Sequence, residues 1–176
     1  AIRAPEVSPD GGGLVWLKDR TSAVSHQLFD TVRGATRSLK TDQTAAQNTN
    51  AAYLTNFTGN GFSLGGDYDV NKPADNYASW TFRRSPKFFD VVTVNHVSGT
   101  ADVVDLAALG AVGMVIIKSV TAANNWLVFH RSLVADTYLA LNSTAAAAVL
   151  SGWNLTSENI TIPAIAATQT FVIYAF

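Results

Sequence analysis

The sequence predicts an all-β protein: a β-sandwich, jelly-roll-like, built from two tandem, internally related halves with one or two short helical turns. Short runs of apolar and β-branched residues recur roughly every 8–12 residues with turn residues between them, a pattern typical of sandwiches and barrels. A second observation is an internal repeat. A third is the central stretch Asn76–Val94, where two apolar runs flank a charged hinge.

The internal repeat appears when the first half of the sequence is shifted by 100 residues over the second. Gly13–Lys18 then falls on Gly113–Lys118, and each segment is a glycine, four apolar residues and a lysine. Similarity at a fixed offset indicates a duplicated unit. The alternative is that two β-rich segments align only because their compositions are similar. We expect residues 13–82 and 113–176 to share one strand order.

The two copies differ in length. Tyr77–Phe82 matches Phe171–Phe176 at a shift of 94, so the second copy has lost six residues. The sequence assigns the six residues to the loop Gly65–Asn76, whose counterpart is the shorter segment Pro163–Gln169.

The hinge Arg83–Lys87 separates the two copies. Pro86 fixes its own φ and disfavours helix at Ser85, so the hinge is a break between elements. The predicted organisation is therefore an extended N-terminal arm over residues 1–12, a first β repeat over 13–84 and a second over 85–176. The two repeats could also be packed as one domain.

Helical turns are expected where alanine is frequent. Thr44–Ala52 and Thr144–Leu150 are rich in the residue of highest helix propensity. Ala101–Leu109 could be a strand or a helical turn.

One strand is missing from the first copy. The second copy opens with the apolar run Phe88–Val94, whereas only the Pro- and Gly-rich arm precedes Leu14. A sheet without that strand has an unpaired edge, which proteins usually cover. Pro5 and Pro9 make the arm itself a poor strand. The sequence therefore predicts a homo-oligomer, or docking onto another protein, with residues 1–13 and the adjoining edge in the contact.

Composition narrows the functional classes. Of 176 residues, 48% are hydrophobic and only 14% charged, and the net charge is -1. This balance argues against nucleic-acid binding and suggests a surface partly covered by partners. The absence of cysteine excludes disulfides and thiolate metal sites. No apolar run reaches the length of about 18 residues that a membrane span needs, so we expect no membrane insertion.

One loop carries alternating oxygen ligands, as a calcium site would. In Asp67–Asn71, however, the EF-hand glycine and glutamate are replaced, by Lys72 and Ala78. A solvated loop with turn-forming Asp and Asn is the simpler interpretation.

The histidines suggest no active site. His26 and His130 lie in corresponding regions of the two copies, and Asp30, Ser25 and Ser132 are near them in sequence. A catalytic triad is defined by geometry and not by such proximity. His96 likewise has no neighbouring ligand set. We expect no catalytic residues, no cofactor and no metal.

Tryptophan could provide a flat surface on which sugars stack. Trp16, Trp80 and Trp126 lie inside strand patterns, which favours a place in the core. Trp153, between Gly152 and Asn154 at a turn, is the best candidate for an exposed ring that binds glycan.

Several motifs carry a resemblance to a known family. They are Leu14–Arg20, Phe29–Thr36, Gly61–Gly65, Tyr77–Phe82, Phe88–Thr93, Met114–Lys118, Trp126–Leu133 and Tyr138–Asn142. Together they resemble a repeated β-rich domain of uncharacterised function in structural proteins of tailed bacteriophages, especially marine ones. The chain departs from that family where Asn95-His96 replaces a turn and Val112 replaces a proline.

The resemblance implies a structural protein of the virion, part of a tail, fibre or surface appendage, that acts through subunit contacts. Its partners would be further copies of the chain and other virion proteins. The alternative is a receptor- or glycan-binding module of a fibre or spike that contacts a host-surface glycan. The resemblance supplies no catalytic residues.

Overall fold

The computed structural model describes residues 2–3 and 11–176, and it confirms the predicted all-β sandwich class. The chain forms two compact units, Ala1–Arg84 and Ser85–Phe176. All strand pairs in both units are antiparallel among the described residues. No helix in these described segments is long and apolar enough to cross a membrane.

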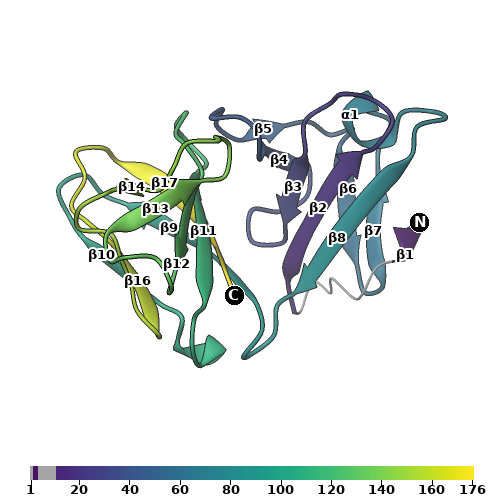
Figure 1. The fold of residues 1–176 in the computed structure, drawn as a ribbon. Coiled ribbons are helices and arrows are strands. Elements are labelled where there is room, and N and C mark those ends of the chain that lie inside the picture. The colour runs from purple at the N-terminus through teal and green to yellow at the C-terminus, as the bar shows by residue number, and fades with distance from the viewer. Residues whose placement is uncertain (1, 4–10) are drawn as a thin grey trace. The chain divides into compact units, whose positions relative to one another are not determined.

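The first unit contains a five-stranded and a three-stranded sheet (Figure 1). The larger sheet has the order β5 (Asn48–Thr49), β4 (Arg37–Lys40), β3 (Gln27–Asp30), β2 (Gly13–Asp19) and β8 (Tyr77–Arg83). The smaller sheet has the order β1 (Ile2–Arg3), β7 (Gly61–Leu64) and β6 (Leu54–Thr58).

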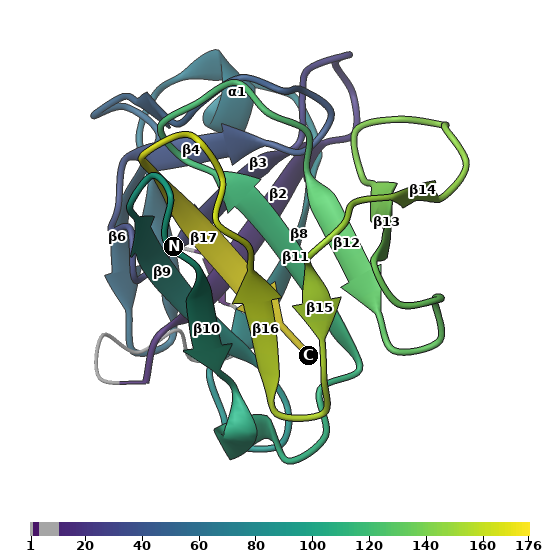
Figure 2. The same cartoon turned by 90° about the vertical axis from the view of Figure 1, so that its left-hand side faces the viewer.

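The second unit repeats this plan with one additional strand. Its larger sheet has the order β14 (Ala148–Val149), β13 (Thr137–Ala140), β12 (Leu127–His130), β11 (Met114–Ser119), β17 (Gln169–Ala175) and β9 (Asp90–His96). Its smaller sheet has the order β10 (Asp102–Asp105), β16 (Asn159–Ile162) and β15 (Asn154–Leu155). Figure 2 shows the smaller sheet in front of the larger one.

The shared strand order confirms the duplication. Val15 on β2 and Val115 on β11 occupy the same place in their sheets, between the hairpin partner and the last strand of the copy. The smaller sheets agree too: Ile2 of β1 lies opposite Phe62, as Val104 of β10 lies opposite Ile160. In the first unit, β1 therefore occupies the place that β10 occupies in the second.

The length difference between the copies is divided between two segments. Tyr53 and Trp153 are still related by the shift of 100. The backbone N–H of each donates a hydrogen bond to the carbonyl of the residue three positions before it. The shift is 98 at the buried pair Phe62 and Ile160, and 94 at the last strand. The sequence assigned all six residues to the loop after β7, which is wrong for two of them. Those two lie in the β6–β7 hairpin, whose first strand is longer than β15.

The predicted helical turns at Thr44–Ala52 and Thr144–Leu150 are wrong. Both segments form loops that contain the two-residue strands β5 and β14. Their alanines lie mostly toward solvent, and so short a helix is unstable without a packed face. Helical structure occurs instead at α1 (Tyr68–Asn71) and in the 3₁₀ turn Ala107–Leu109, where one residue of each, Val70 and Leu109, is buried.

Each unit has its own core between its two sheets. The buried core of the first unit consists of Val15, Leu17, Phe29, Tyr53, Leu54, Phe57, Phe62 and Val70. The core of the second unit consists of Leu106, Leu109, Val112, Val115, Ile117, Phe129, Trp153, Ile160, Ile162, Phe171, Ile173 and Ala175. Alternate residues of β2 and β11 supply the sheet side of each core, as the two-residue period of a strand requires.

Most of the predicted arm, residues 1 and 4–10, lies outside the described residues. Its described part, β1, pairs with β7. The predicted opening strand of the second copy is β9, which pairs with β17 along all seven residues of β17. The first unit has no described strand in the equivalent place beside β8.

Candidate functional site

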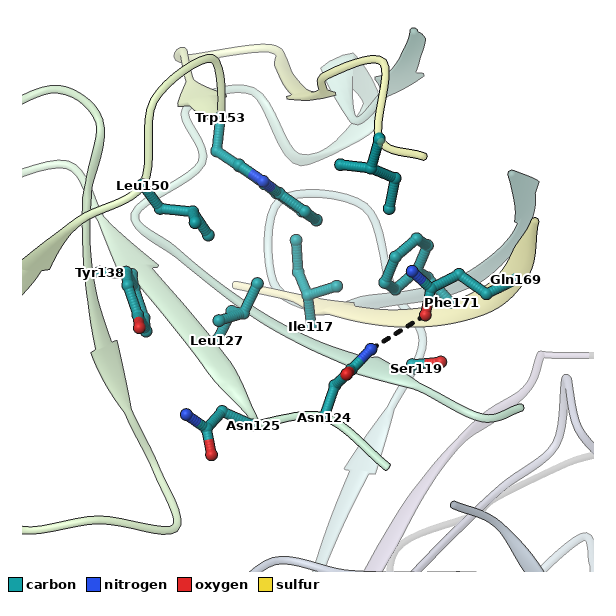
Figure 3. A pocket seen from close by; sticks show the side chains of 11 residues that line it. Ile117, Ser119, Asn124, Asn125, Leu127, Tyr138, Leu150, Trp153, Gln169 and Phe171 are labelled. Carbon is teal, nitrogen blue, oxygen red and sulfur yellow. Dashed lines mark hydrogen bonds between the residues drawn. The ribbon is translucent and has the colours of Figure 1, made fainter. Parts of the chain in front are cut away.

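A pocket of about 280 Å³ opens in the second unit. Its apolar lining comes from the floor residues Ile117, Leu127 and Phe171 and from the wall residues Tyr138, Leu150 and Trp153 (Figure 3). The floor residues lie on β11, β12 and β17, which are adjacent strands of the larger sheet. Leu150 and Trp153 belong to the connection between β14 and β15.

Trp153 is not the exposed ring that the sequence predicts. Its side chain is 4% exposed. One face stacks on Phe129, with centroids 5.6 Å apart and an interplanar angle of 11°, and the ring meets Phe171 edge to face at 5.9 Å. The turn is as predicted, with Gly152 at a φ of 85°, a conformation that favours glycine. The turn directs the indole into the core because an aromatic face is available there.

The exposed tryptophan is Trp80 on β8, at 50%. The strand pattern predicts that Trp80 and Trp126 both lie in the core. The prediction is wrong for Trp80 and right for Trp126, which is fully buried. Trp16 is half-buried and donates its indole N–H to His26 Nδ1 at 2.9 Å. A residue inside a strand can face either side of its sheet, so the strand pattern alone does not decide burial.

Amide side chains form the polar rim of the pocket. Asn124 donates to Gln169 Oε1 at 3.0 Å, drawn in Figure 3. Asn125 Oδ1 accepts from Asn142 at 3.0 Å, and Ser119 Oγ accepts from the Ala122 amide at 3.1 Å. The lining contains no carboxylate, histidine or lysine. The site can therefore bind an apolar group with amide contacts at its rim, and it lacks the base that would activate a nucleophile.

The first unit fills the corresponding space with α1. Asp69 Oδ2 accepts from Gln27 at 3.1 Å and from the Tyr53 hydroxyl at 3.3 Å, and it lies 3.2 Å from Lys40 Nζ. The shift of 100 places Gln27 and Tyr53 at Leu127 and Trp153, both of which line the pocket. The shorter loop of the second copy contains no such helix, so its pocket stays open.

The candidate calcium loop is used for structure. Asp67 caps α1, accepting from the Asp69 amide at 2.8 Å and from Asn50 Nδ2 at 2.8 Å. Asp69 binds the side chains of Gln27, Tyr53 and Lys40. Over residues 2–3 and 11–176, no group of three or more His, Cys, Asp or Glu residues has an arrangement that could hold a metal ion.

The histidine, aspartate and serine residues that lie near one another in sequence have other partners. Asp30 forms an ion pair with Arg33, Ser25 Oγ accepts from Gln43 at 2.8 Å, and His26 binds Trp16. Burial, and next the charge of Lys18, lower the pKa of His26. His130 Nδ1 accepts from the Ser132 amide at 3.1 Å. The structure therefore does not assemble a nucleophile, a base and an orienting carboxylate from these residues.

Two ionisable groups of the second unit are more deeply buried than the sequence suggests. His96 on β9 is buried, with Nδ1 2.6 Å from Asp102 Oδ2 on β10 and its ring edge-to-face with Phe171. Lys118 on β11 is fully buried, and its Nζ donates to the Ala122 carbonyl at 3.3 Å. The sequence does not reveal this burial, because polar residues at the ends of predicted strands are usually exposed.

Burial lowers the pKa of Lys118 from 10.5 to about 8. The folded chain therefore releases this proton at lower pH than the unfolded chain does. Between pH 8 and 10.5 the unfolded state binds more protons, so stability rises with pH. We expect the free energy of unfolding to increase by at most about 1.4 kcal/mol per pH unit in this window.

Urea denaturation of the full chain between pH 7.5 and 9.5 measures this effect. Lys118→Met should abolish the rise, whereas Lys18→Met, at the corresponding place in the first copy, should leave it. A wild-type stability that is flat or falls over this range would contradict the assignment to Lys118.

The edge of β8, beside which no described strand lies, is the second candidate site. Arg84 N donates to Gly12 O at 3.0 Å and Arg20 N donates to Asn76 O at 2.7 Å, so the even-numbered residues of this segment face β2. In an antiparallel ladder the intervening residues point their N–H and C=O groups the other way. The outward backbone groups of Ser79 and Thr81 have no hydrogen-bond partner among the described residues.

These features define the protein as a β-sandwich of two units, with an apolar pocket in one and, in the other, a sheet edge beside which no described strand lies. The chain belongs to a family described as a domain of unknown function (DUF7483), which matches residues 4–176. No curated protein and no solved structure matches the chain.

Proposed function

We propose that this chain is a structural protein of a tailed-bacteriophage virion, in a tail, fibre or surface appendage, and that it works through assembly contacts with further copies and other virion proteins. The observation that carries the assembly role is the edge of β8, which has no neighbouring strand among the described residues. Unpaired backbone groups at a sheet edge favour the addition of a strand from another chain. The virion setting rests on the sequence motifs that resemble phage structural proteins.

The pocket is suited to binding an apolar group. Its lining offers apolar contact and amide hydrogen bonds, with no acid–base pair. The low charge of the sequence agrees with a surface that partner proteins cover.

The location of the chain tests this proposal. Purified virions of a phage that encodes the chain should contain it at a fixed copy number by quantitative mass spectrometry, and a reconstruction should place it in a tail or surface appendage. Detection only in the infected-cell lysate, with none in purified particles, would overturn the proposal.

A glycan-binding module is the second candidate, and the pocket is the observation that favours it. Aromatic side chains beside amides, such as Tyr138 with Asn124 and Asn125, can recognise the apolar face and the hydroxyls of a sugar. Trp153 contributes little to stacking because Phe129 covers one of its faces.

A glycan array with the purified chain separates the two candidates. For the assembly role we expect no signal above that of an unrelated β-sandwich protein. A signal that Tyr138→Ala removes, while Tyr68→Ala in the first unit leaves it unchanged, would establish the glycan-binding function instead.

A further inference from the structure

We infer that two copies of this chain pair antiparallel through their β8 edges about a two-fold axis, with Trp80 opposite Trp80 of the second copy. This inference deepens the proposed assembly function and rests on it.

The second unit shows that this edge can accept a strand. β17 is the counterpart of β8, and its residues Phe171 and Ile173 correspond to Tyr77 and Ser79. In the second unit β9 covers these residues in antiparallel register, with Val94 opposite Phe171. The geometry that supports β9 is therefore present beside β8, where no described strand lies.

The side chains of β8 do not suit a strand like β9. Val92 of β9 lies opposite Ile173 and packs against the second core. The corresponding residue of β8 is Ser79, and Thr81 replaces Ala175. A strand with valine at these places would set apolar side chains opposite hydroxyls. The edge therefore favours a partner with polar residues on this face.

β8 itself is such a partner. In an antiparallel pair of identical strands centred on Trp80, Ser79 lies opposite Thr81 of the second copy, and this contact occurs twice by symmetry. Cross-strand Ser–Thr and aromatic pairs both stabilise a sheet. Because the outward backbone groups belong to Ser79 and Thr81, the two strands form hydrogen bonds at these residues and place Trp80 in a non-hydrogen-bonded pair, where side chains lie closest.

Trp80 is positioned for this contact. It is half exposed and rests edge-to-face on Trp16, with ring centroids 6.3 Å apart. Pairing would bring two Trp16–Trp80 units together and remove their exposed aromatic surface from water. Residues 77–82 of this edge contain neither proline nor a charged residue, and the one charged residue of β8, Arg83, lies at its end.

Sedimentation velocity of the full chain tests the pairing. We expect a concentration-dependent monomer–dimer equilibrium and at least a tenfold higher dissociation constant for Trp80→Lys, which sets two charges opposite each other. The matched control Tyr68→Lys changes an exposed aromatic residue of α1 and should leave the constant unchanged. A wild-type chain that remains monomeric, or a Trp80→Lys dimer of unchanged affinity, would overturn the inference.

Cysteine cross-linking tests the register. The chain has no cysteine, so one introduced thiol can bond only to a second copy. Trp80→Cys should form a disulfide dimer under mild oxidation, because opposed Cα atoms in such a pair lie about 4.5 Å apart. Ala78→Cys, which lies opposite Phe82 of the second copy in this register, should cross-link at least tenfold more slowly. Equal or faster cross-linking at position 78 would refute the register.

These results are independent of the virion test. A chain that is present in virions but monomeric in solution and without cross-linking overturns the β8 pairing and leaves the structural role. A dimer with the expected register, absent from virions, overturns the virion role and leaves the pairing.

Discussion

Replacing Trp153 with alanine should lower the free energy of unfolding of the second unit by about 3–5 kcal/mol, the range measured when a large buried aromatic residue is removed from a core. The indole is buried, stacks on Phe129 and meets Phe171 edge to face. It also closes one wall of the pocket. The loss therefore combines lost burial with an enlarged cavity that the two sheets cannot close.

Hydrogen–deuterium exchange of the full chain, followed by mass spectrometry, assigns this effect to a unit. Protection should fall across peptides of residues 85–176 and change much less in residues 11–84. Trp80→Ala is the matched control: its side chain is half exposed, so its effect on the monomer should be much smaller. Similar losses for the two variants would contradict the assigned role of Trp153.

Replacing Arg33 with methionine should destabilise the first unit by about 3–5 kcal/mol, because it leaves a buried carboxylate without its charged partner. Arg33 Nε lies 2.6 Å from Asp30 Oδ2, and the two side chains are 3% and 0% exposed. The Arg33 guanidinium also binds Gln47 Oε1 at 3.1 Å and the Leu28 carbonyl at 3.2 Å. Chemical denaturation with exchange measurements on residues 11–84 would detect the loss.

The second copy supplies the control for this prediction. It has His130 and Leu133 in the places of Asp30 and Arg33, so its fold is compatible with a site without the ion pair. The double variant Asp30→Asn/Arg33→Leu should regain much of the stability that the single Arg33 change removes, since no buried charge is left unpaired. A double variant as unstable as the sum of the two single changes would show that the ion pair is not the source of the effect.

Local sequence patterns determined the fold class and the strand order. Gly13–Lys18 and Gly113–Lys118 are apolar runs with the same glycine and lysine at their ends, and they form the equivalent strands β2 and β11. A strand needs only its own residues to show apolar and β-branched character, and a duplication is visible as one sequence compared with itself. The boundary between the two compact units falls between Arg84 and Ser85, within the Pro-containing hinge.

The candidate sites were decided by contacts between segments distant in sequence. Trp153 is buried because Phe129 and Phe171, on two other strands, provide faces for its ring. The pocket beside it exists because the shorter second loop lacks the helix that carries Asp69 and Val70 in the first copy. Neither outcome follows from residues near position 153, so a local pattern could indicate a turn there and not the direction of the side chain.

The alanine-rich segments likewise show that long-range packing, and not local sequence, decided the outcome. Their high helix propensity is a weak preference, and helices of a few residues form only where a buried face stabilises them. The sequence by itself determined which runs become strands and that two copies share one sandwich. Only the tertiary structure decided which loop enters a core, where the pocket lies and which side chains of β8 face solvent, because these depend on long-range packing and on the hydrogen-bond partners that each strand finds.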